Sequence, residues 1–222
     1  MKENKISTRD LILQVAKEQF SIRGYTNTPI RLILEKAGIS KGGFYHHFAS
    51  KEEIIDILAK MQVDSVADIL YKISEDKEST AIEKFNELIL KMLAFRSQNR
   101  DHLYRLFDVF MRDDNLELKY KIDTYTFKMV KPPYVKIVEQ GINEGVFHTS
   151  SPELAVETII RVAPALRLKM AKLYIEKNTN DHVEADIRKV ADFLEEIVLK
   201  ILGANEGSLK ISELFTSYFF DN

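Results

Sequence analysis

The chain has 222 residues, of which 45% are hydrophobic and 30% are charged, as expected for one or two globular domains with a sizeable core. It contains no cysteine, which excludes disulfides and thiolate metal sites. It has neither an apolar run that could cross a bilayer nor the apolar centre of a signal peptide. We therefore expect a cytoplasmic protein with no membrane partner. The first 50 residues carry eight cations and four anions, a net charge of +4, which leaves −6 for the remainder.

Helical periodicity runs through the sequence, without strand alternation or a tandem repeat, and predicts an all-α protein. The N-terminal helices are short. Their starts are marked by residues whose side chains can cap a first turn: Ser7, Thr28, Ser40 and Ser50. The helices expected here span 8–22, 28–37, 40–48 and 51–73. Gly24 and Gly38 end the first two, and Pro29 suits the first position of the second.

Longer helices follow. They are expected over 80–98, 101–112, 116–130, 133–144, 151–177 and 183–202. Pro132 and Pro133 should interrupt the chain between the third and fourth of these, because proline lacks the amide hydrogen and clashes with the preceding turn. The aromatic tail over 209–220 predicts a further short helix docked on the C-terminal domain, with a frayed terminus as the alternative.

Two short helices joined by a tight turn at Gly38 have the shape of a helix-turn-helix, which places its second helix in the major groove of DNA. Phe44 and Phe48 are four residues apart and should both face the core, whereas Lys41 and Tyr45 should point elsewhere. The basic N-terminal end suits a segment that meets phosphate. The alternatives are chance charge asymmetry and a slack turn beside a buried aromatic pair.

The stretch 28–51, TPIRLILEKAGISKGGFYHHFASK, closely resembles the helix-turn-helix of the TetR family of transcriptional regulators. The resemblance extends back to Phe20 and Gly24-Tyr25. A weaker likeness covers 141–147, GINEGVF, with the Ser151-Pro152-Glu153 that follows. Leu34 departs from the family, which usually has a small alanine there.

The resemblance implies the domain organisation and the DNA contacts. Residues 1–50 would form a three-helix DNA-binding domain, 51–73 a linking helix, and 74–222 a helical bundle for ligand binding and dimerisation. Arg31 and Lys41 would reach base edges, for which their donors suit guanine. The whole set expected at the DNA is Thr28, Arg31, Ser40, Lys41, Gly42, Gly43, Tyr45, His46, His47 and Lys51.

The resemblance also implies a homodimer through the helices at 151–177 and 183–202, although their apolar faces could equally be core. The middle of the chain is rich in aromatic residues and methionine, which build either a core or a ligand pocket. The residues proposed for a small ligand are Phe95, His102, Arg105, Phe107, Phe110, Met111, Tyr125, Met129, Arg161 and Arg167.

These features favour a homodimeric repressor that a small hydrophobic or amphipathic ligand releases from an inverted-repeat operator in double-stranded DNA. A regulator that activates, or that needs its ligand in order to bind, is the alternative. A helical enzyme is a further one, although no HExxH, P-loop, GxSxG or cysteine nucleophile is present. We expect no cofactor and no metal, since adjacent residues such as His46 and His47 face different ways on a helix.

Overall fold

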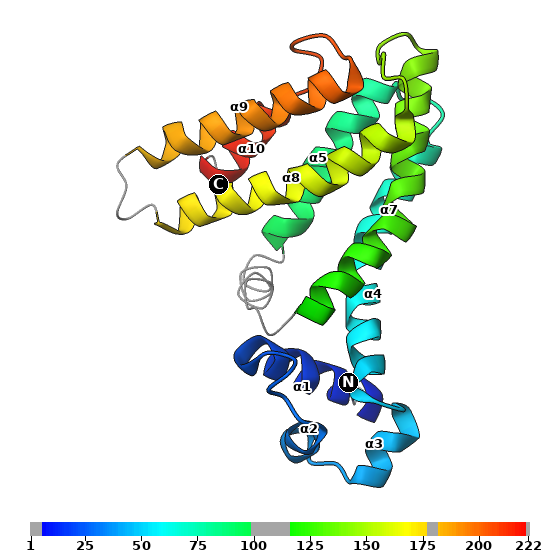
Figure 1. Ribbon diagram of the computed structural model, residues 1–222, viewed down its shortest axis with the longest axis vertical. Coiled ribbons are helices and arrows are strands. Elements are labelled where there is room, and N and C mark those ends of the chain that lie inside the picture. Colours follow the sequence, from blue (N-terminus) through cyan, green and yellow to red (C-terminus); the bar gives the residue numbers. More distant parts are fainter. Residues whose placement is uncertain (1–5, 99–115, 177–181, 221–222) are drawn as a thin grey trace, which may run out of the picture. The chain divides into compact units, whose positions relative to one another are not determined.

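The computed structural model describes residues 6–98, 116–176 and 182–220 (Figure 1). All regular elements in these ranges are α-helices, as the sequence predicts. They are α1 (Thr8–Arg23), α2 (Ile30–Ala37), α3 (Lys41–His47), α4 (Lys51–Glu75), α5 (Ala81–Gln98), α7 (Leu116–Asn143), α8 (Pro152–Ile175), α9 (Val183–Leu202) and α10 (Ile211–Phe220). The helix expected at 101–112 lies outside the described residues. The chain divides into two compact units, one within 1–65 and 99–126 and the other within 66–98 and 127–222.

Three of the predicted N-terminal caps are confirmed. The backbone N–H of Asp10 donates to Ser7 Oγ over 3.1 Å, and that of Gly43 donates to Ser40 Oγ over 3.0 Å. The N–H of Glu53 donates to Ser50 Oγ over 3.2 Å. A serine at each of these positions satisfies one of the donors that a helix start leaves unpaired.

The cap predicted at Thr28 is wrong. Helix α2 begins at Ile30, and Pro29 precedes it without any side-chain hydrogen bond. The Thr28 hydroxyl is fully buried and donates to the carbonyl of Gly24 over 2.7 Å. It therefore closes the loop after α1 instead of capping α2, because a buried hydroxyl needs a nearby acceptor.

The core of the first unit is built mainly from α1 and the first half of α4, with one side of α2 and α3 packed against them. Its fully buried members include Ile12, Ala16, Phe20, Ile33, Phe44, Phe48, Ile54 and Ile55. Two side chains of α7, Ile122 and Tyr125, also pack against this core. The first unit thus draws on a segment that is distant in sequence.

In the second unit α8 and α9 lie side by side, and α10 packs against α9 and α5 (Figure 1). The predicted terminal helix is therefore confirmed. Ile211, Phe215 and Phe219 are buried on its inner face. Its first turn is tied to α9, since the N–H of Ser212 donates to Glu195 Oε2 over 2.9 Å.

The predicted interruption at Pro132 and Pro133 is wrong, because α7 runs unbroken through both prolines. Tertiary contacts on either side hold the helix. Just before the prolines, Lys131 pairs with Glu157 of α8, and just after them Tyr134 lies against Phe85, with ring centroids 5.5 Å apart. Such packing overrides the local preference against proline in a helix.

The end of α7 explains the GINEGVF pattern. A Cβ atom at Gly141 would lie 2.1 Å from Cδ2 of Phe147, so only glycine leaves room for this ring. The N–H groups of Val146 and Phe147 both donate to the carbonyl of Gly141. Phe147 is fully buried, so the chain reverses tightly over Gly141 before α8 begins.

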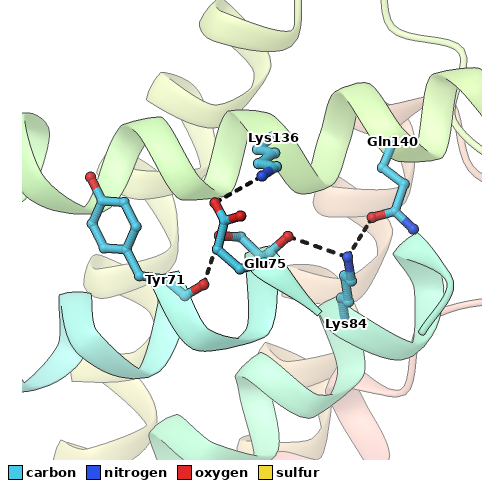
Figure 2. Close-up of polar contacts among 6 residues, drawn as sticks. Tyr71, Glu75, Lys84, Lys136 and Gln140 are labelled. Atoms are coloured by element: carbon cyan, nitrogen blue, oxygen red, sulfur yellow. Dashed lines mark hydrogen bonds and ion pairs between the residues drawn. The ribbon is translucent and has the colours of Figure 1, made fainter. Parts of the chain in front are cut away.

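A buried lysine joins the ends of three helices of the second unit (Figure 2). Lys84 of α5 is 2% exposed, and its ammonium donates to the carbonyl of Ser74 in α4 over 3.3 Å and to Oε1 of Gln140 in α7 over 2.6 Å. Nearby, Lys136 of α7 pairs with Glu75 of α4 over 2.8 Å. The Lys136 ammonium keeps the pKa of the Glu75 carboxyl below its usual range.

Candidate nucleic-acid interface

Helix α3 has one buried and one exposed side. Phe44 and Phe48 are buried with ring centroids 5.8 Å apart, as their spacing predicts. Lys41, Tyr45 and His46 are exposed. A short helix that is anchored by two phenylalanines and presents polar side chains outward has the form of a DNA-reading helix.

The exposed side of α3 is partly organised by ring contacts. The Lys41 ammonium lies 5.9 Å from the centroid of the Tyr45 ring. The imidazole rings of His46 and His47 meet edge to face at 4.9 Å, and His47 is half-buried. A Cβ atom at Gly43 would meet only Ser40 Oγ, at 3.4 Å. The start of α3 is therefore open to close approach by another backbone.

Arg31 lies exposed in the first turn of α2. Within the described residues neither Arg31 nor Lys41 forms an ion pair. Both cations therefore remain available to an external anion or to the acceptor groups on base edges.

Lys51, one of the residues expected at the DNA, makes contacts within the protein. Its Nζ donates to the carbonyl of Tyr25 over 2.8 Å and lies 4.1 Å from the centroid of the Tyr25 ring. These contacts fasten the start of α4 to the loop after α1.

At the start of α4, backbone N–H groups donate hydrogen bonds to the protein's own carboxylates. Glu53 Oε2 accepts from the N–H of Ala49 over 2.6 Å. The pKa of Glu52 is lowered because its carboxylate accepts hydrogen bonds, first from its own backbone N–H and then from the Ser50 side chain. Backbone N–H groups at a helix start can bind an external anion, and here they are partly occupied by the protein's own carboxylates.

Two residues expected at the DNA or the ligand lie elsewhere. Thr28 is buried with its hydroxyl engaged, so its side chain does not reach the surface. Tyr125 packs against the core of the first unit, because α7 contributes to that core.

The structure describes only some of the other residues proposed to bind a small ligand. His102, Arg105, Phe107, Phe110 and Met111 lie outside the described residues, and the side chain of Phe95 does too. Arg161 is exposed, with its guanidinium 4.3 Å from the centroid of the Phe127 ring, and Met129 is half-buried. Arg167 lies near Tyr134, where burial raises the pKa of the phenol and the arginine charge opposes that rise.

Arg9 was not anticipated as part of this surface. Its guanidinium carbon lies 5.5 Å from the centroid of the Phe48 ring, at the end of α3. A cation in the first turn of a helix opposes the helix dipole, and this unfavourable position is the feature of the sequence that could have pointed to Arg9.

No three histidine, aspartate or glutamate side chains gather as a metal site would need, as far as the structure describes the chain. In the same residues, no helix has the length and apolar character needed to span a membrane.

Known proteins share both the motif and the fold. A family model described as bacterial regulatory proteins of the tetR family matches residues 12–57. The transcriptional repressor KstR2 of Mycobacterium tuberculosis is 29% identical over 160 residues, which cover 70% of this chain and 75% of that protein.

Solved structures agree on the fold. A SmeT–triclosan complex superposes with a TM-score of 0.69 at 18% identity, and covers 91% of this chain and 94% of that one. The fatty acid degradation regulator FadR of Bacillus halodurans superposes with a TM-score of 0.61 at 19% identity, and covers 92% and 99%.

Proposed function

Since the chain belongs to the TetR family of bacterial regulatory proteins, we propose that it is a homodimeric repressor that binds an inverted-repeat operator and is released by a small hydrophobic or amphipathic ligand. The observation that carries the proposal is the exposed side of α3, held by buried Phe44 and Phe48 within the matched segment. We expect this activity in the cytoplasm, because its target is DNA.

The DNA contacts divide into reading and positioning. Arg31 and Lys41 read base edges, and the glycines at 42 and 43 let the helix start approach the groove. Tyr45, which is exposed, and His47, which is half-exposed, contact phosphates or thymine methyl groups, and the exposed His46 lies beside them. Ser40 contributes by capping α3, and Lys51 by fixing the start of α4 and offering a donor to phosphate.

Dimerisation uses the outward faces of α8 and α9. The inward faces pack within the chain itself, where Ala155, Ile159 and Leu194 are buried. On the outward faces Leu154 and Ile175 of α8 and Phe193 of α9 are exposed large apolar side chains. We assign their cover to a second copy of this chain, because a two-fold dimer matches a two-fold operator.

The ligand binds in the second unit. KstR2 is a transcriptional repressor, FadR a fatty acid degradation regulator, and SmeT forms a complex with triclosan. These relatives support a hydrophobic or amphipathic effector, for which Met129 and Arg167 of the expected set remain candidates. The ligand releases DNA only in so far as it binds the released state more tightly than the bound one.

Selection from a random duplex library tests the DNA function directly. The purified protein should enrich an inverted repeat and bind it as a dimer, with an affinity that falls steeply as salt rises. Arg31→Ala should cost about 1–3 kcal/mol and relax the preference at one base position. Lys51→Ala should weaken binding to all sequences. Failure to enrich any repeat would contradict the proposal, and enrichment only in the presence of cell extract would instead indicate a co-repressor.

A further inference from the structure

Arg9 and Phe48 are 39 residues apart in sequence yet meet at one end of α3. The Arg9 side chain is exposed, and its guanidinium lies over the ring of Phe48, the residue that ends α3. Phe48 is buried while Arg9 is exposed, so the guanidinium reaches the ring from the surface of the protein. This contact fixes a guanidinium beside the DNA-reading helix.

Folding does not account for the charge at this position. Arg9 lies in the first turn of α1, where a cation opposes the helix dipole. The cap is already supplied by Ser7, which is paired with Asp10. Within residues 6–98, 116–176 and 182–220 Arg9 has no ion pair and no hydrogen-bond partner. An apolar side chain would cover Phe48 equally well.

We propose that Arg9 binds a backbone phosphate of operator DNA at the C-terminal end of α3. This inference rests on the DNA-binding function proposed above. The cation–π contact with Phe48 restricts the guanidinium, whose N–H groups have no protein partner among the described residues and can make the two-pronged contact that arginine forms with phosphate. Lys41 occupies the first position of α3, so the reading helix has a cation at each end. Arg9 is a positioning contact that sets register and carries no sequence preference.

The test is the salt dependence of binding to the selected inverted repeat. Arg9→Met keeps a long unbranched side chain that can cover Phe48 and removes the charge. Its log–log slope should be shallower than the wild-type slope by about 0.9 for each protomer, because one counterion fewer is released. The affinity advantage of wild type should shrink by about threefold per protomer between 50 and 200 mM salt, which follows from the same slope. Arg9→Lys should keep the slope and bind more weakly, because it lacks the fork.

Lys72→Met is the matched control. Lys72 is an exposed cation in the last turn of α4, so this variant has the same change in net charge and should keep the wild-type slope. The melting temperature of Arg9→Met should not fall, and the selected base preferences should not change.

Each contrary result has a distinct meaning. A wild-type slope in Arg9→Met together with a lower melting temperature would overturn the inference, since Arg9 would then only cover Phe48. A changed base preference would also overturn it, in favour of base reading. If the wild-type protein shows no salt-dependent binding to any duplex, the proposed function fails and this inference fails with it.

Discussion

The buried side chain of Lys84 is expected to contribute to the free energy of unfolding through its two hydrogen bonds. Lys84→Met would fill the same space but leave the Ser74 carbonyl and Gln140 Oε1 without their donor. We expect a loss of about 1–3 kcal/mol for each acceptor left unpaired, measured as the free energy of unfolding in urea.

Lys136→Met is the control for Lys84→Met, since its ion pair with Glu75 is exposed (Figure 2). It should change the free energy of unfolding by less than about 1 kcal/mol. A Lys84→Met protein as stable as wild type would contradict this expectation. It would show that the free energy of desolvating the ammonium equals the stabilisation from its two hydrogen bonds.

For single residues, the sequence predicted which side chains of α3 are buried, but it did not predict where the Thr28 side chain lies. The spacing of Phe44 and Phe48 predicted burial, and Lys41 and Tyr45 were correctly expected to point elsewhere. Thr28 was misplaced, because its acceptor is the carbonyl of Gly24 and not the start of the following helix. Such a choice depends on loop geometry, which periodicity does not encode.

At the scale of elements, the two prolines inside α7 offer a test of how tertiary packing overrides local preference. Pro132 is exposed, so Pro132→Ala restores a backbone donor without losing packing, and should raise the free energy of unfolding by up to about 3 kcal/mol. Pro133 is buried, and Pro133→Ala should gain less because it also loses contacts. Thermal melts of both variants would check this, and a destabilised Pro132→Ala would mean that the packing on either side requires the proline geometry.

Helix α10 is expected to be an integral part of the second unit. Truncation after Gly207 removes four buried apolar side chains, and each contributes about 1.5–3 kcal/mol when fully buried. They are Leu209, Ile211, Phe215 and Phe219. The truncated protein should therefore melt well below the full chain while its selected operator stays the same.

Glu213→Ala, a change at an exposed position of α10, is the control and should leave the melting temperature almost unchanged. A truncated protein that melts like the full chain would contradict a stabilising role for α10.

Helix starts were predictable because a cap is a local feature. Ser7, Ser40 and Ser50 each bond an amide three residues onward. The continuity of α7 was not predictable, since it depends on contacts with α5 and α8 that are distant in sequence. The contribution of α7 to the first core was missed for the same reason.

At the scale of the whole molecule, two adjacent residues of α9 test the proposed dimer interface separately from folding. Phe193 is 52% exposed and Leu194 is 3% exposed. Phe193→Glu should therefore give a folded monomer, with helical circular dichroism retained and a lower sedimentation coefficient. Leu194→Glu should lose the fold itself, because a charge cannot be buried unpaired. A Phe193→Glu protein that remains dimeric would show that the copies meet through another surface.

The first unit is discontinuous in sequence, and this has a consequence for the timing of synthesis. Its core includes Ile122 and Tyr125, although the rest of it is complete by residue 65. A ribosome adding about 5–20 residues per second takes roughly 3 to 12 s to cover the interval to residue 126. During that interval the emerging chain has made α3 but not the two α7 side chains that pack against the core of this unit. A nascent chain should therefore acquire its full operator affinity only after most of α7 has left the ribosome.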